Sequence, residues 1–166
     1  MNIFALDEKP EKAVEMYLDS HVVKQILETA QMLSAAHRVL GYNDDVFYKL
    51  THKNHPCTKW VRENSANYFW AFRLFDALCT EYTYRYNKTH LSETKLYGVL
   101  SFEPKLIPIS NTVTPFPQAM PLEFRSDNSI DAYRNYYKYK FKVLKRKTWT
   151  KRPIPLFLLD TIPERR

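Results

Sequence analysis

The sequence is poor in glycine, in cysteine and in long apolar runs, and each shortage excludes a class of protein. Its 166 residues include only two glycines, so it lacks the Gly-rich loop of P-loop kinases and dinucleotide-dependent oxidoreductases. Its two cysteines, Cys57 and Cys79, do not suggest a disulfide scaffold and fit a reducing compartment. No run approaches the roughly 18 apolar residues of a membrane span, and the first residues lack the basic and apolar regions of a signal peptide.

Apolar and aromatic residues, in contrast, are plentiful. They make up 45% and 15% of the chain, which is enough for one hydrophobic core and excludes a disordered protein. Because a domain typically has about 100–200 residues, we expect a single compact domain over residues 1–166.

Two long helices dominate the pattern. A 3.6-residue apolar stripe predicts a helix from Asp19 or Ser20, either of which would cap it, to about residue 40, with Gly41 ending it. A second helix is predicted over 56–86, and its aromatic residues nearly encircle the axis, so we expect it to be buried between other helices. The fold class is therefore all-α around a long buried central helix.

The rest of the chain is predicted in shorter pieces. Five prolines break residues 101–128 into a long ordered loop, a candidate lid. A last helix over 129–146 is expected to be capped by Asp127 or Ser129, and an extended tail follows it. In the tail, Ile154, Leu156, Phe157 and Leu159 are expected to dock on the core. Short helices are predicted over 10–18 and 92–100.

Positive charge is concentrated at the C-terminal end. Residues 126–166 contain 11 Lys and Arg against four Asp and Glu, whereas residues 1–125 contain 14 of each. Tyrosines alternate with the basic residues in the segment 129–152, and aromatic rings stack on bases while cations neutralise phosphates. This pattern indicates a DNA partner, the alternative being a solvated helix face that confers solubility. The residues expected to hold the DNA backbone are Arg134, Lys138, Lys140, Lys142, Lys145, Arg146 and Lys147.

The first candidate catalytic group is His21, Lys24 and Glu28. Their spacing of three and four residues places all three on one helix face. An imidazole, an amine and a carboxylate together offer a titrating group, a nucleophile and an acid or base. The alternative is an ordinary Lys–Glu surface pair, worth about 0.2–0.5 kcal/mol.

Two further groups are candidates for substrate binding. His52, Asn54 and His55 lie close together beside Cys57, but a closed zinc site needs four ligands and no second close pair is available, so we expect no metal and no cofactor. Arg62 and Asn64 are polar residues on a helix that otherwise looks buried. They are predicted either to orient a substrate or to tie loops to the core.

Several motifs together resemble known families. The segments LDSHVVKQILETAQML, THKNHPCTKWVRENSANY and AYRNYYKYK resemble a family of small uncharacterised tailed-phage proteins. More distantly, the chain resembles the pyrimidine-dimer DNA glycosylase/lyases of the phage endonuclease V type, which are small, helical and basic and end in an aromatic-basic segment like Tyr133–Lys138. In that family the α-amino group of the processed N-terminus attacks the sugar C1′, forming a Schiff base, and a helix glutamate assists.

Two features depart from that family's pattern. Asn2 is bulky, and a bulky second residue normally blocks removal of Met1, so the free amine would be that of Met1. No Arg-Glu pair lies between residues 15 and 30, and Glu28 is the nearest acid on the helix. Lys24 is our hypothesis for a replacement amine, because a bifunctional glycosylase needs an amine nucleophile.

We therefore predict an all-α phage protein of the host cytoplasm that acts on DNA as a glycosylase/lyase or base-modifying enzyme on a flipped nucleotide. We expect no membrane partner. The alternatives are a non-enzymatic early phage protein that binds DNA or a host or phage protein, and an enzyme of free nucleotides.

Overall fold

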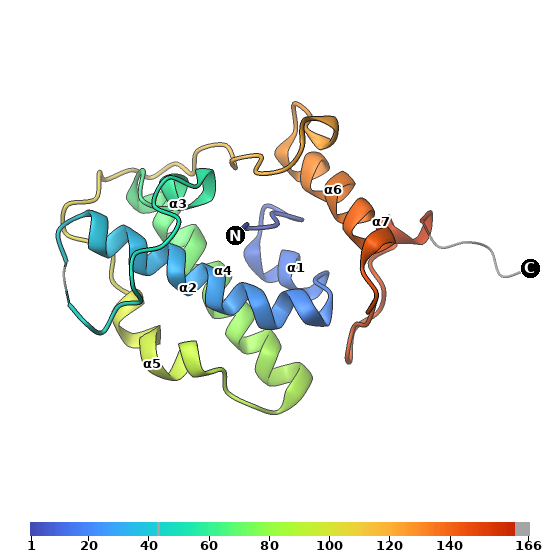
Figure 1. The fold of residues 1–166 in the computed structure, drawn as a ribbon, viewed down its shortest axis with the longest axis horizontal. Helices are drawn as coiled ribbons and strands as arrows, with labels where there is room; N and C mark the ends of the chain where they lie inside the picture. Colours follow the sequence, from blue (N-terminus) through green and yellow to red (C-terminus); the bar gives the residue numbers. More distant parts are fainter. Residues whose placement is uncertain (43, 162–166) are drawn as a thin grey trace, which may run out of the picture.

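The structure, a computed structural model, describes residues 1–42 and 44–161, and every regular element in them is helical (Figure 1). The all-α prediction is confirmed. The elements are α1 (Pro10–Glu15), α2 (Asp19–Val39), α3 (Pro56–Val61), α4 (Ser65–Tyr86), α5 (Leu91–Leu100), the 3-10 helix η1 (Leu122–Phe124), α6 (Ser129–Val143) and α7 (Leu156–Leu159). Among the basic residues of 126–166, Arg165 and Arg166 lie outside the described residues.

Helix α4 is the centre of the fold. It packs against α1, α2, α3 and α5, and Figure 1 shows it crossing behind α2. Neighbouring residues along it are buried in succession, among them Trp70 with Ala71 and Leu74 with Phe75. More than one face of α4 is therefore covered, as the aromatic pattern predicts for a helix between other helices.

The prediction of one helix over 56–86 is wrong in one respect, because the helix is interrupted between Val61 and Ser65. Asn64 is extended there, and its side-chain Oδ1 accepts a hydrogen bond of 3.0 Å from the Asn67 N–H. Asparagine is among the best N-cap residues, so this cap starts a new helix inside an otherwise continuous apolar pattern. At the start of α3, the His55 Nδ1 accepts from the Cys57 N–H at 3.2 Å.

The break at Asn64 is where the proline-rich loop docks. The Ser65 N–H donates to the Pro108 carbonyl at 2.9 Å, and the Asn67 side chain donates to Thr114 Oγ1 at 2.8 Å while accepting from the Thr114 N–H at 2.9 Å. Residues 101–128 are thus tied to the core of the protein.

Several predicted helix ends are also wrong. Leu18, not Asp19 or Ser20, is the cap residue of α2, and Asn128 caps α6 by accepting from two backbone N–H groups. Helix α6 ends at Val143, three residues before the predicted end. The left-handed φ of +100° at Gly41 ends α2 as expected.

The C-terminal tail contains a short helix and not only extended chain. Leu158 is fully buried there, while Leu156 is 82% exposed, so the register of the predicted docking is wrong. Phe157 packs against the core as expected, whereas Ile154 and Leu159 are exposed. Helix α7 decides which side of the tail faces the core. The sequence pattern does not predict this helix, because only four residues form it.

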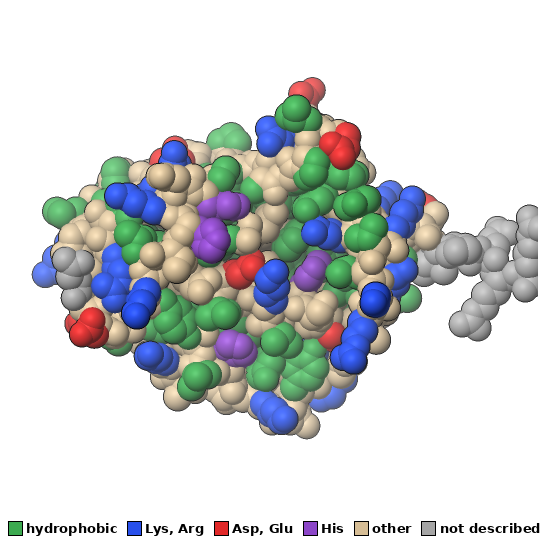
Figure 2. All heavy atoms as spheres, viewed as in Figure 1, with side chains coloured by type: hydrophobic (Ala, Val, Ile, Leu, Met, Phe, Trp, Pro, Cys, Tyr) green, Lys and Arg blue, Asp and Glu red, His purple; other side chains and the backbone are tan. Residues whose placement is uncertain are grey.

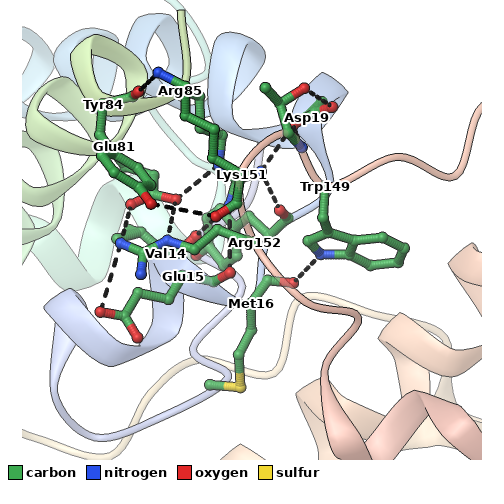
Figure 3. A network of polar contacts seen from close by, with 12 residues as sticks. Val14, Glu15, Met16, Asp19, Glu81, Tyr84, Arg85, Trp149, Lys151 and Arg152 are labelled. Atoms are coloured by element: carbon green, nitrogen blue, oxygen red, sulfur yellow. Dashed lines mark hydrogen bonds and ion pairs between the residues drawn. The ribbon is translucent and has the colours of Figure 1, made fainter.

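A buried ion-pair network joins four parts of the chain (Figure 3). The side chain of Arg85 on α4 is fully buried and lies 2.7 Å from Glu81 and 2.9 Å from Asp19 at the start of α2. It also donates to the Tyr17 carbonyl at 2.8 Å. From the tail, Arg152 reaches the second oxygen of Glu81 at 2.8 Å.

The position of Asp19 in this network explains why it does not cap α2. Burial raises the pKa of Asp19, but hydrogen bonds from Thr150 and from Arg85 outweigh that effect and lower the pKa to about 2. Its carboxylate accepts from the Thr150 N–H at 2.8 Å and from the Thr150 hydroxyl at 2.9 Å. The carboxylate thus ties the tail to α2.

Replacing Glu81 tests the weight of this network. Glu81→Ala leaves Arg85 without one carboxylate in a buried site, and we expect the free energy of unfolding to fall by about 3–5 kcal/mol in urea denaturation. The matched control is Arg73→Ala, which removes an exposed ion pair with Glu11 and should cost less than about 1 kcal/mol. Equal losses in the two variants would contradict a central role for the network.

Candidate active site

The N-terminal segment runs through the core instead of along the surface. Ile3, Ala5 and Leu6 have no exposed surface, although the first residues of most domains are poorly ordered. The Tyr17 hydroxyl lies 2.7 Å from the Ile3 carbonyl oxygen and 2.8 Å from that of Phe4. The position of the chain's first residue is therefore fixed by packing and by hydrogen bonds.

A strained turn brings this segment against α2. Phe4 has a φ of +35°, a conformation that is costly for a bulky side chain, and its ring stacks on His21 with the ring centres 4.9 Å apart. The Asn2 side chain accepts from the Ile3 N–H at 2.8 Å and donates to the Ala119 carbonyl at 2.9 Å. The turn is thereby held between α2 and the proline-rich loop.

The segment lines a polar cavity of about 180 Å³. Figure 2 shows histidine side chains and an acidic side chain close together near the middle of one face of the molecule, with basic side chains nearby. The N-terminal segment, α2, the proline-rich loop and α6 all contribute walls. The cavity is lined by Met1, Asn2, Phe4, His21, Lys24, Gln25, Glu28, Ala119, Tyr136 and Lys140.

Glu28 is the acidic group of this cavity, and two amines face it. Its Oε1 lies 3.4 Å from Lys24 Nζ and 3.7 Å from the Met1 α-amino nitrogen. Its Oε2 accepts a hydrogen bond of 3.0 Å from Gln25 Nε2. A carboxylate in contact with amines is placed to move their protons, which nucleophilic attack by an amine requires.

His21 is a neutral member of the site. Burial, together with the charges of Lys140 and Lys24, lowers the pKa of His21 to about 4. Its Nδ1 lies 2.8 Å from the Tyr137 hydroxyl, which already accepts from the Leu18 N–H at 2.8 Å. Donation of the hydroxyl proton to Nδ1 satisfies both groups, and in that arrangement the ring's hydrogen is on Nε2. His21 is thus a hydrogen-bond donor at neutral pH.

The predicted substrate-binding group is only partly brought together. Burial lowers the pKa of His55, the positive N-terminus and His52 lower it further, and Glu28 opposes them, so His55 lies within electrostatic reach of the cavity. His52 and Asn54 are exposed and do not line it.

Asn64 caps a helix in this structure, and Arg62 lies away from the cavity. The Asn64 side-chain oxygen is occupied by the cap of α4, and only 7% of the residue is exposed. Arg62 follows α3, and its Nη1 is buried without a hydrogen-bond partner. Neither residue lines the cavity.

The predicted basic residues lie in different surroundings. Lys140 lines the cavity, and its Nζ lies 5.1 Å from the centre of the Tyr136 ring. Arg134 donates to the Leu6 carbonyl at 2.9 Å and lies 3.9 Å from Asp7, so it holds the N-terminal segment. Lys138 is half-buried, and the exposed basic residues are Lys142, Lys145, Arg146 and Lys147.

Sequence reasoning missed Gln25, Asn2 and Tyr136 as parts of the site. The one signal that was available is the spacing of three residues between Gln25 and Glu28, which lets their side chains meet on a helix. Nothing in the sequence joins Ala119 to Asn2, which are 117 residues apart.

Within residues 1–42 and 44–161, no group of three or more His, Cys, Asp and Glu side chains is arranged to hold a metal ion. Burial raises the pKa of the Cys57 thiol to about 12, which leaves it protonated at neutral pH. In the same residues, no helix combines the length and the apolar character needed to cross a membrane.

Residues 1–94 match the family model of the pyrimidine dimer DNA glycosylases, more than half of the chain. The chain belongs to this family. The predicted resemblance to the pyrimidine-dimer DNA glycosylase/lyases is thereby confirmed. Membership of this family supports DNA as a substrate or partner. The matched residues 1–94 include Met1, His21, Lys24 and Glu28. Lys140 and the other basic residues of the segment 129–152 lie beyond them. Neither a search of the curated proteins nor one of the solved structures finds a match.

The depressed pKa of His21 can be measured directly. We expect its imidazole to titrate near pH 4, against an ordinary value of 6.5, in ¹H–¹⁵N NMR spectra of the folded protein. Because the unfolded chain binds this proton more readily, the stability that His21 contributes is complete above pH 6.5 and falls as the pH falls to about 4. A midpoint near 6.5 would contradict the buried, neutral imidazole.

Proposed function

We propose that this protein is a DNA glycosylase/lyase whose nucleophile is the α-amine of Met1 and whose acid–base group is Glu28. The proposal rests on one observation: the N-terminal segment is buried, and the α-amino nitrogen of Met1 lies 3.7 Å from Glu28 Oε1. A chain end fixed at the wall of a polar cavity is unusual, and an amine beside a carboxylate is what Schiff-base chemistry requires.

Two amines face Glu28, and positioning favours that of Met1. The Met1 side chain is 2% exposed, whereas that of Lys24 is 67% exposed, and a nucleophile gains most when its position is fixed before the substrate arrives.

The reaction follows from these groups. The amine attacks the sugar C1′, the bond between C1′ and the base breaks, and the electron pair leaves with the base. Glu28 accepts one proton that the amine loses, and a second passes to the departing base. The C1′–O4′ bond of the sugar ring then breaks, Glu28 returns its proton to O4′, and a protonated Schiff base forms between nitrogen and C1′. Loss of the C2′ proton then expels the 3′ phosphate. The neutral His21 donates a hydrogen bond to the sugar or to the departing base.

The depth of the site supports action on a flipped nucleotide. C1′ inside a duplex cannot reach an amine at the wall of a recess, so the nucleotide must leave the stack. Lys24 and Lys140 line the cavity, and cations there would bind the flanking phosphates. The exposed basic residues at the end of α6 and just after it would extend that contact. Phage origin and placement in a host cytoplasm stay predictions.

Borohydride trapping tests the chemistry. We expect a covalent adduct with duplexes that carry an abasic site or an ultraviolet-induced pyrimidine dimer. Glu28→Gln should lower the trapping rate by a factor on the order of 10²–10⁴, while DNA affinity changes little because the variant keeps the shape of the side chain. The intact mass of the protein is measured first, to establish that Met1 carries a free amine.

Peptide mapping of the reduced adduct identifies the nucleophile. We expect the sugar remnant on the peptide that contains Met1, and Lys24→Ala should keep the adduct, as should the matched control Lys12→Ala. A remnant on Lys24, with loss of the adduct in Lys24→Ala only, would assign the reaction to the amine hypothesised from the sequence. Salt-dependent DNA binding without any adduct would overturn the lyase proposal and favour a non-enzymatic DNA-binding protein.

The basic segment is tested by the salt dependence of DNA binding. Replacing Lys142, Lys145 and Arg146 by Gln should flatten the slope of log affinity against log salt by about 0.9 for each residue that contacts a phosphate. The control replaces three exposed lysines elsewhere, Lys12, Lys88 and Lys105, with the same loss of charge. Equal slopes in the two variants would show that the segment makes no phosphate contact.

A further inference from the structure

Gln25 lies against the carboxylate of the proposed site and is itself almost completely buried. Its exposed fraction is 1%, and its side chain lines the cavity beside Glu28. Its Nε2 donates a hydrogen bond of 3.0 Å to Glu28 Oε2. An ionised carboxylate only accepts hydrogen bonds, so this contact fixes which end of the amide faces Glu28.

The other end of the amide has no partner. The Gln25 Oε1 is buried without a hydrogen bond, and leaving a buried acceptor unsatisfied costs about 1–3 kcal/mol. An apolar side chain of the same length, such as methionine, would fill the same space without that cost. Stability of the fold therefore does not explain a glutamine at this position.

We propose that Gln25 is a positioning residue for Glu28, an inference that rests on the proposed function. Its amide N–H holds Oε2, and the carboxylate consequently turns Oε1 toward the Met1 amine at 3.7 Å and the Lys24 amine at 3.4 Å. Without this contact, only the two amines at Oε1 constrain the rotation of the carboxylate about its last bond. Gln25 touches neither amine and acts through Glu28.

Charged and titratable groups surround Glu28, and they come from the N-terminal segment, α2, the start of α3 and α6. They are the Met1 amine, Lys24, His21, His55, Cys57 and Lys140. None of them donates to Oε2 in this structure, so the effect of Gln25 can be separated from theirs.

The experiment compares Gln25→Met with the matched control Gln31→Met, the same change two turns further along α2 and outside the cavity. The first readout is the single-turnover rate of Schiff-base formation with abasic duplex DNA. We expect Gln25→Met to slow it by a factor on the order of 10–100. DNA affinity should match that of the control, and thermal stability should not fall below it.

The second readout does not depend on activity. The ¹³C chemical shift of the Glu28 side-chain carboxyl at neutral pH should change in Gln25→Met and stay in place in Gln31→Met, because only the first variant removes a hydrogen bond to that carboxylate. If Gln25→Met does not fold, Gln25→Glu replaces it: it keeps the shape of the side chain, removes the N–H donor and should also change this chemical shift.

The outcomes separate the two proposals. A wild-type protein that forms no adduct, but whose Glu28 carboxyl ¹³C shift changes in Gln25→Met, would overturn the proposed chemistry and support the positioning role. A rate and a chemical shift equal to those of Gln31→Met would overturn the positioning role, whatever the activity of the wild type. A loss of stability with both readouts unchanged would assign Gln25 to the fold and overturn the inference as well.

Discussion

The position of the site depends on the buried guanidinium of Arg85. A buried cation is tolerated only when it is paired and its remaining donors are satisfied, and Arg85 achieves this with Glu81, Asp19 and the carbonyl oxygen of Tyr17. Two of these partners lie at the first turn of α2 and just before it, so the network fixes where α2 starts and how it is rotated about its axis. The rotation decides which α2 side chains face the N-terminal segment. His21, Gln25 and Glu28 enter the cavity for that reason.

The cavity is a place where several preferences of the chain are not met. Phe4 has a left-handed backbone, Gln25 keeps an unpaired oxygen, and a carboxylate lies in a mostly buried position. Such features cost stability and persist only where the surroundings determine them. Here the burial of Ile3, Ala5 and Leu6 supplies the compensating hydrophobic free energy. The same residues therefore anchor the chain end and maintain the strain beside it.

The cavity also joins two parts of the chain with different relations to the family. The amines, the carboxylate and the imidazole all lie in residues 1–94, the part that matches the pyrimidine dimer DNA glycosylases. Ala119, Tyr136 and Lys140 complete the walls from the part beyond the match. Arg134, which lies beyond the match, holds the two parts together, because its side chain donates a hydrogen bond of 2.9 Å to the Leu6 carbonyl near the start of the chain. The reactive groups thus come from the part of the chain that matches the family, and three of the residues that surround them come from the part beyond the match.

The sequence by itself determined the helical class, the α2 face that carries His21, Lys24 and Glu28, and the irregular proline-rich loop, because each depends on local spacing or backbone chemistry. Only the tertiary structure decided that the Met1 amine meets Glu28 and that Arg134 serves the N-terminal segment. It also decided that Gln25 is buried with an unpaired oxygen. These features arise from contacts between residues as much as 128 positions apart, and periodicity contains no information about such pairs. The cap at Asn64 is the intermediate case, because its signal is local but was outweighed by the apolar pattern around it.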